Sequence, residues 1–360
     1  MKLTDKFSHI KYLDNIKRFR GIEKTRFNKI RLDANERVSN FSERFLLNFK
    51  RKINSNYLTA YPETEQIYKL LAKNYGMSPK NYFITAGSDI AIRHCFELFV
   101  KKGSNIICLD PTFGMYNVYS KIFRAKVTNV NFDSKLNLNY SKMINSINKK
   151  TSFIIFANPN SPTGTIIESK KIFKIIQKAK KNNCYVIIDE AYFGFYKKSY
   201  IKYIKKFNNL IIIRTFSKSL GLAGIRAGYL VSNEKLIEKL YKFRPMYEIN
   251  SFAVLLIKEI LKNKKEYTNY IKDTIKGKKY LEKQLLKLKL RYFKTFANFM
   301  LIDFKKPDIQ RKVFSYLNSK NILVRLPPEI PACKNHLRFT LGPEKYMKII
   351  IRILKGIIRQ

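Results

Sequence analysis

The sequence predicts an α/β protein in which a mainly parallel central sheet carries helices on both faces and is followed by a smaller α+β unit. Three observations lead to this expectation. Short apolar runs alternate with amphipathic stretches, the runs are apolar on both faces, and polar residues gather after the runs. The 360 residues, 45% of them hydrophobic, suffice for a large unit with a smaller companion.

Six apolar runs are the expected strands of the central sheet. Between the third and fourth run, Ile172, Ile175 and Ile176 occupy one helical face and lysines the other, which predicts a crossover helix. Helical crossovers of this kind join parallel strands. The runs are residues 82–84, 106–109, 153–157, 185–188, 210–213 and 229–231.

Polar residues follow five of these runs at the point where each expected strand ends. Because ligands bind beyond the carboxyl ends of the strands in an open parallel sheet, we expect the five clusters to face one crevice. The clusters are residues 85–89, 110–113, 158–160, 189–190 and 214–218.

The pattern changes after about Asn250 to long lysine-rich helices, with an interruption at Gly277 and a final helix whose apolar face includes Met347. Strand-like segments follow the first of these helices, at residues 298–304, 322–324 and 337–340. We therefore expect three parts: an N-terminal arm that packs on the small domain or a partner subunit (1–50), a large domain (51–250) and a small C-terminal α+β domain (251–360).

The composition argues against several classes of protein. No apolar stretch reaches 18 residues and the N-terminus lacks the apolar core of a secretory signal, so we expect a soluble, cytoplasmic protein with no membrane partner. The four cysteines are scattered and are expected to be buried free thiols. Since the three histidines are isolated from other ligand residues, no metal site is expected.

The charge is strongly basic, with 72 Lys plus Arg against 26 Asp plus Glu and a formal net charge of +46. Such a balance raises nucleic acid or an anionic membrane as a partner. However, the basic residues are spread over the whole chain and accompany many Ile, Asn, Phe and Tyr without any Trp, the residue set of AT-rich codons. We interpret the charge as composition drift that also attracts anionic substrates, and expect no nucleic-acid partner.

Residues 214–229, with the sequence RTFSKSLGLAGIRAGY, form the most specific segment of the chain. This segment resembles the lysine region of fold type I aminotransferases that use pyridoxal 5′-phosphate (PLP), and it is most similar to the histidinol-phosphate aminotransferase group. The resemblance extends over about residues 31–344. It implies the fold type I architecture, and it implies that the chain holds PLP as a Schiff base on Lys218.

The residue types around Lys218 suit that role. A lysine amine, with an ordinary pKa of ~10.4, must lose its proton to attack an aldehyde, and an enclosed site with neighbouring cations lowers the pKa. Thr215, Ser217 and Arg226 can donate hydrogen bonds to the cofactor phosphate, the arginine as a rigid fork. The alternative is that Lys218 is one surface lysine among many.

Two further motifs match the family in the same order. NPNSPTG at 158–164 is similar to the family's NPNNPTG turn, which implies that Asn158 binds the phenolic oxygen of the cofactor. DEAY at 189–192 resembles the element whose aspartate pairs with the pyridinium nitrogen, so the resemblance assigns this role to Asp189 and assigns Tyr192 to assist Asn158. Taken alone, an acid at a strand end is more often a helix cap.

The residues AGSD at 86–89 open an expected helix, and helix amino termini bind phosphate through free N–H groups. The resemblance implies that Gly87, Ser88 and Asp89 hold the cofactor phosphate. It also implies that Phe113 stacks on the cofactor ring, with an ordinary core aromatic as the alternative.

Tyr61 and the proline after it resemble the YPD segment of the family, with Glu63 in place of the aspartate. The resemblance implies that Tyr61 reaches the cofactor phosphate of the other subunit in a homodimer with shared active sites. A buried structural tyrosine is the alternative.

The sequence LRFTLG at 337–342 is like the family's LRIxxG strand, which implies that Arg338 grips the anionic group of the substrate, with Arg325 as a second contact. Two arginines that converge on one pocket favour an oxyanion. LDANERV at 32–38 stands where the family has LNANENPxG, and the resemblance implies a substrate contact for Asn35. The missing Pro and Gly fall on the element that lines the substrate pocket.

These features predict a PLP-dependent aminotransferase that exchanges an amino group, with glutamate as the expected donor, with a small phosphorylated substrate. A PLP-dependent decarboxylase of amino-acid O-phosphates is the alternative, because it shares the fold, the lysine and similar arginines and differs in which bond of the α-carbon is cleaved. A basic nucleic-acid-binding protein would leave the converging motifs unexplained.

Overall fold

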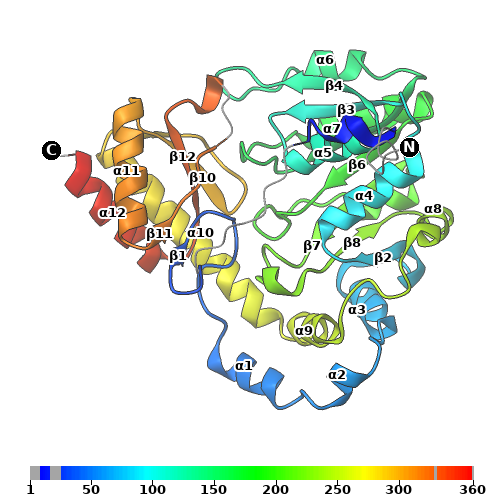
Figure 1. Cartoon of the computed structure of the whole chain (residues 1–360), viewed down its shortest axis with the longest axis horizontal. Coiled ribbons are helices and arrows are strands. Elements are labelled where there is room, and N and C mark those ends of the chain that lie inside the picture. The colour runs from blue at the N-terminus through cyan, green and yellow to red at the C-terminus, as the bar shows by residue number, and fades with distance from the viewer. Residues whose placement is uncertain (1–8, 17–25, 328–330, 359–360) are drawn as a thin grey trace, which may run out of the picture.

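The computed structural model describes residues 9–16, 26–327 and 331–358. Its largest element is a seven-stranded sheet on one side of the molecule, and a smaller unit with its own sheets lies on the other side (Figure 1). The strand order of the large sheet is β2 (Tyr82–Thr85), β8 (Gly228–Val231), β7 (Leu210–Thr215), β6 (Tyr185–Asp189), β5 (Thr151–Ala157), β3 (Asn105–Asp110) and β4 (Lys126–Asn131).

The large sheet is mainly parallel, as the sequence predicts. Within the described strands of this sheet, β8 alone runs antiparallel to its neighbours β2 and β7. The remaining neighbours pair in parallel. All six expected strands are present, and β4 is an additional edge strand that the sequence analysis missed, because its residues are mostly half-buried or exposed and include Lys126 and Asn131.

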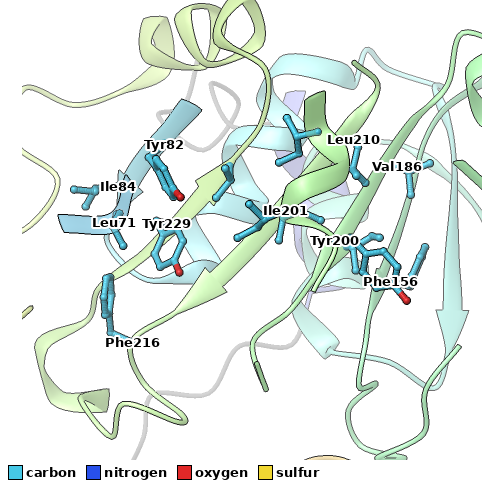
Figure 2. Packing of buried hydrophobic residues seen from close by; sticks show 14 of the residues in the cluster. Leu71, Tyr82, Ile84, Phe156, Val186, Tyr200, Ile201, Leu210, Phe216 and Tyr229 are labelled. Carbon is cyan, nitrogen blue, oxygen red and sulfur yellow. The ribbon is translucent and has the colours of Figure 1, made fainter. Parts of the chain in front are cut away.

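Helices cover both faces of this sheet, and alternate strand residues point to each cover. Ile154 and Phe156 belong to one core with α3 (Glu65–Tyr75), α7 (Ser169–Lys181) and α9 (Ser251–Lys262), and Figure 2 shows ten labelled members of this core packed over the strands. Phe153 and Ile155 belong to the other core, with α4 (Ser88–Phe99), α5 (Gly114–Ile122) and α8 (Glu234–Leu240). Side chains alternate between the two faces along a strand, and both faces are covered. Nearly every residue is therefore buried, so the strands appear in the sequence as continuous apolar runs.

The smaller unit contains an antiparallel sheet in the order β12 (His336–Thr340), β10 (Phe299–Asp303) and β9 (Arg291–Tyr292). It packs with α10 (Lys264–Lys287), α11 (Pro307–Ser319) and α12 (Glu344–Ile358) around a separate core. Strand β1 (Ile30–Arg31) pairs in parallel with β11 (Ile322–Leu323), which attaches residues 30–31 to this unit. The two-residue strands β1 and β9 were not expected, because two residues carry no periodicity.

The N-terminal region divides between the two units. The hydroxyl of Tyr12 donates to the carbonyl of Ile122 at the end of α5 (3.1 Å), whereas β1 pairs within the smaller unit. Helices α1 (Glu43–Lys50) and α2 (Asn56–Thr59) lie beneath α9 (Figure 1). Residues 1–8 and 17–25 of the expected arm lie outside the described residues, and the expected domain boundaries stay predictions.

Two further features concern the chemistry of the surroundings. Cys95, Cys108, Cys184 and Cys333 are buried free thiols, as expected, and burial raises the pKa of each. Among the described residues, no helix is long and apolar enough to cross a membrane.

Gly277 allows α10 to pack closely on the turn before α12, because a Cβ there would overlap the carbonyl oxygen of Gly342. We expect Gly277→Ala to lower the free energy of unfolding by about 1–3 kcal/mol, the typical cost of overpacking. Gly356→Ala in α12 is the matched control, since a Cβ there meets open space and alanine favours the helix. Chemical denaturation measures both; equal stability of the two variants would contradict the close-packing explanation.

Candidate active site

A cavity of about 1210 Å³ lies beyond the carboxyl ends of the parallel strands in the large sheet. Four of the five expected polar clusters line it directly, through Ser88, Phe113, Asp189 and Ser217 among others. The fifth cluster, 158–160, is flanked by residues that also line it. The structure therefore brings the clusters together in one crevice, and the smaller unit closes the opposite wall.

Lys218 lines this cavity, in the turn that follows β7. Its Nζ donates a hydrogen bond to the carbonyl oxygen of Ala34 at 3.0 Å. Desolvation of the amine, with the positive charges of Arg338 and Arg226, lowers the pKa of Lys218 to about 8. About a tenth of this amine is therefore unprotonated at pH 7, far more than of an ordinary lysine.

Asp189 ends β6 and is almost completely buried. Burial raises the pKa of this carboxyl to about 6, although the hydroxyl of Tyr116 donates to Oδ2 and the amide of Ala191 donates to Oδ1, both at 2.9 Å. The carboxylate is thus held in a fixed orientation and remains ionised above pH 6. A buried anion of this kind suits a cationic partner in the cavity.

Asn158, at the end of β5, has a buried amide donor without a protein acceptor. Its Oδ1 accepts from the amide of Ile167 at 2.8 Å, while Nδ2 has no partner among the described residues. Because an unpaired buried donor is costly, this Nδ2 indicates an acceptor that a ligand supplies.

Tyr192 is held beside the cavity by the N-terminal segment. Its hydroxyl accepts from Nδ2 of Asn35 at 3.0 Å, and burial raises the pKa of the phenol. Asn35 is itself fixed, since its backbone N–H donates to Oγ1 of Thr340 at 2.9 Å and its backbone adopts φ 56°. A hydrogen bond therefore joins the hydroxyl of Tyr192 to the side-chain amide of Asn35 at the cavity wall.

Hydrogen-bond donors gather at the N-terminus of α4. Gly87 precedes this helix with φ 91°, and a Cβ there would lie 3.0 Å from Nη2 of Arg226, so the guanidinium lies beside the helix end. Ser88, Asp89, Thr215, Ser217 and Arg226 all line the cavity. A helix N-terminus with an adjacent arginine and hydroxyls fits a phosphate group.

Arg325 and Arg338 face each other across an antiparallel bridge in the smaller unit, with backbone N–H···O distances of 3.1 and 2.8 Å. Nη2 of Arg338 donates to the carbonyl of Asp33 at 2.7 Å, and its buried Nε has no partner among the described residues. Burial, together with the charge of Arg325, lowers the pKa of Arg338. Both arginines line the cavity and can bind an anion.

The two aromatic residues singled out from the sequence differ in position. Phe113 lines the cavity and packs edge-on against Tyr116, with ring centroids 5.7 Å apart. Tyr61 is 74% exposed, is not part of the cavity wall, and stacks on Tyr247 at 4.2 Å. It is therefore not the buried structural tyrosine that was the alternative.

The sequence analysis did not single out Tyr116, and it included Glu190 and Arg214 in the polar clusters without pairing them. Tyr116 contacts Asp189 across 73 positions, and no local pattern marks it. Glu190 and Arg214 form a buried ion pair, Oε2 to Nη2 2.8 Å, between the ends of β6 and β7. Opposite charges at the ends of two neighbouring strands were the signal that could have found this pair. Among the described residues, no group of three or more His, Cys, Asp or Glu could hold a metal ion.

Comparisons with known proteins agree with this geometry. Residues 28–354 match the family model described as "Aminotransferase class I and II". The histidinol-phosphate aminotransferase of Caldanaerobacter subterraneus subsp. tengcongensis is 33% identical over 336 residues, 92% of this chain and 93% of that protein. The enzyme of the same name from Clostridium novyi is 34% identical over 332 residues, 91% of each chain.

Solved structures share the fold. Histidinol-phosphate aminotransferase from Sinorhizobium meliloti, solved in complex with pyridoxal-5′-phosphate, has a TM-score of 0.83 at 21% identity and covers 92% of this chain and 91% of that one. L-Threonine-O-3-phosphate decarboxylase from Porphyromonas gingivalis has a TM-score of 0.76 at 18% identity and covers 92% of this chain and all of that one. At these identities the likeness concerns the fold alone. The expected fold type I architecture is confirmed.

The lowered pKa of Lys218 is directly testable in cofactor-free protein. Because the neutral amine is the reactive form, labelling of Lys218 by a small acylating reagent should rise with pH and level off above a midpoint of about 8. A short unstructured peptide with a single lysine, added to the same reaction, is the reference amine and should still be gaining reactivity near pH 10. Mass spectrometry of the digested protein measures both; a common midpoint would contradict the effect of burial.

Proposed function

Since this chain belongs to the aminotransferase class I and II family and is a PLP-dependent aminotransferase, we propose that it transfers an amino group between glutamate and a small phosphorylated compound. Histidinol phosphate is the first candidate, because the curated relatives that cover over nine-tenths of the chain carry that name. The observation that supports this proposal best is the convergence of Lys218, Asp189 and two arginines on one cavity, beside which lies the unpaired donor of Asn158.

The residues present fit the cofactor. We assign its phosphate to the N-terminus of α4 with Arg226, its ring nitrogen to Asp189, its phenolic oxygen to the unpaired Nδ2 of Asn158 and its aldehyde to Lys218. The supporting phosphate contacts that we propose are Gly87, Ser88, Asp89, Thr215 and Ser217. When bound, PLP withdraws electrons from the α-carbon of the substrate, so that a proton can leave it.

The protein side chains then divide the remaining work. Asp189, ionised above pH 6, holds a proton on the ring nitrogen, which keeps the ring electron-poor. Lys218, as a neutral amine, would take the α-proton on Nζ and deliver it to C4′, the aldehyde carbon of the cofactor. Tyr192, fixed by Asn35, donates beside Asn158, and Phe113 covers the ring at the cavity wall.

The smaller unit supplies the substrate contacts. We propose that Arg338 binds the anionic group on the α-carbon, because its buried Nε is unpaired among the described residues. Arg325, across the backbone bridge, adds a second cation, and Asn35 adds an amide contact. A phosphate or a carboxylate fits this pair of arginines.

We propose that the chain forms a homodimer in the cytoplasm. Large hydrophobic side chains are exposed on and around α1 and α2 and before α9, and Tyr61 stacks on Tyr247 within this surface. In a dimer this surface would bring Tyr61 to the phosphate site of the other subunit. Four buried thiols that remain free favour a reducing compartment. The exposed side chains are Leu46, Leu47, Ile53, Leu58, Tyr61, Phe243, Met246 and Tyr247.

The amino donor can be tested by mixing the PLP-loaded protein with L-glutamate alone. We expect the visible cofactor band to bleach and 2-oxoglutarate to appear in proportion to active sites. Lys218→Ala should slow this half-reaction by about 10⁴-fold or more, because the proton carrier is absent. Lys205→Ala, at an exposed position, is the matched control and should behave as the wild type.

The same experiment separates the proposal from its alternative. A band that persists with glutamate, together with carbon dioxide release from phosphoserine or phosphothreonine, would favour the decarboxylase. A band that bleaches leads to acceptor screening among phosphorylated ketones and aldehydes, beginning with the ketone that corresponds to histidinol phosphate.

A further inference from the structure

The N-terminal segment from Arg26 to Arg37 lies along the cavity and contacts its reacting groups. The carbonyl of Asp33 accepts from Arg338 at 2.7 Å and that of Ala34 accepts from Lys218 at 3.0 Å. The backbone of this segment is therefore held beside the amine at Asp33 and Ala34. We refer to residues 26–37 as the strap.

Three ion pairs within the strap join four of its charged side chains. Arg26 uses Nη1 to bind Oε1 of Glu36 (3.0 Å) and Nη2 to bind Oδ1 of Asp33 (2.8 Å). Arg31 uses Nε to bind Oε2 of Glu36 (3.2 Å). All four side chains line the cavity, so the pairs are part of its wall.

Arg31 keeps most of its donors for a ligand. Arg26 is committed through both terminal nitrogens, whereas Nη1 and Nη2 of Arg31 have no partner among the described residues. Because Glu36 holds Nε, the guanidinium plane is fixed and its outer edge stays available. Two parallel N–H groups on such an edge match a carboxylate in a bidentate pair.

The position of Arg31 places this edge on the wall opposite the large sheet. β1 pairs with β11, with Arg31 beside Leu323, and Arg325 follows two residues later on the same wall. Glu36 also contributes to the field at Lys218, which indicates that the carboxylate lies near the amine. Arg31 and Arg338 line the same cavity, so it offers a cation for each end of a substrate with two anionic groups.

We propose that Arg31 binds the side-chain carboxylate of the amino donor and that Glu36 positions it, so that the enzyme selects dicarboxylic donors. This inference rests on the proposed function, in which Arg338 binds the α-carboxylate. Glu36 neutralises Arg31 only in part, because it is shared with Arg26. A carboxylate on the edge of Arg31 completes its charge pairing, while a neutral side chain leaves the donors unpaired.

The test compares L-glutamate with L-glutamine, its neutral isostere, in the cofactor-bleaching half-reaction of PLP-loaded protein. Arg31→Gln should lower kcat/KM for glutamate by about 10- to 100-fold, mainly through KM, and change that for glutamine by less than about threefold. Arg31→Lys should recover part of the loss, because the charge remains. Arg352→Gln, at an exposed position in α12, is the matched control and should change neither substrate.

A binding measurement keeps this inference separate from the proposed function. Glutarate has both carboxylates and no amine, so calorimetry reports its affinity for the PLP-loaded protein without turnover. Weaker binding of glutarate to Arg31→Gln, with unchanged cofactor content, supports the assignment even if glutamate is not the donor. Equal losses for glutamate and glutamine, or unchanged glutarate affinity, would overturn it. Failure of the wild type to bleach with glutamate would instead count against the proposed function.

Discussion

The rest of the site depends on the burial of one lysine amine between two units of the protein. Lys218 lies at the end of β7, and its amine bonds to the strap, which β1 attaches to the smaller unit. Desolvation and two arginines favour the neutral amine, whereas Asp189 and Glu36 oppose them. The balance leaves the pKa at about 8, where the same nitrogen can both lose and accept a proton near neutral pH.

A second buried pair holds the strand ends that position this amine. Glu190 and Arg214 are neighbours across β6 and β7. Glu190 directly follows the proposed catalytic residue Asp189, and Arg214 lies in the strand that leads to Lys218. The guanidinium also lies 3.5 Å over the ring of Phe193 and the carboxylate accepts from the amide of Tyr200. Although burial alone would lower the pKa of Arg214, Tyr229 and Glu190 raise it, so the guanidinium stays charged. Such a buried pair fixes geometry, since breaking it would leave an uncompensated charge.

The sequence predicted the features that depend on local pattern. Six strands buried on two faces appear as apolar runs, and their polar ends converge because parallel strands end at one edge. Local pattern could not reveal β4, whose exposed edge weakens the apolar run, nor Tyr116, whose partner lies on another strand. The resemblance pointed to Asn35, which lines the cavity, but nothing in the sequence marked Glu36 or Arg31, because only the folded strap brings them to the cavity wall.

The strongly basic composition and the arginines of the cavity act over different distances. The net charge of +46 is a long-range field, which salt screens beyond about 8 Å at physiological ionic strength. In the cavity, Arg26 and Arg31 are paired with Asp33 and Glu36, so these four side chains together add no net charge to the cavity wall. Discrimination between substrates therefore depends on a few oriented donors at hydrogen-bond distance, and drift in the surface lysines can proceed without altering them.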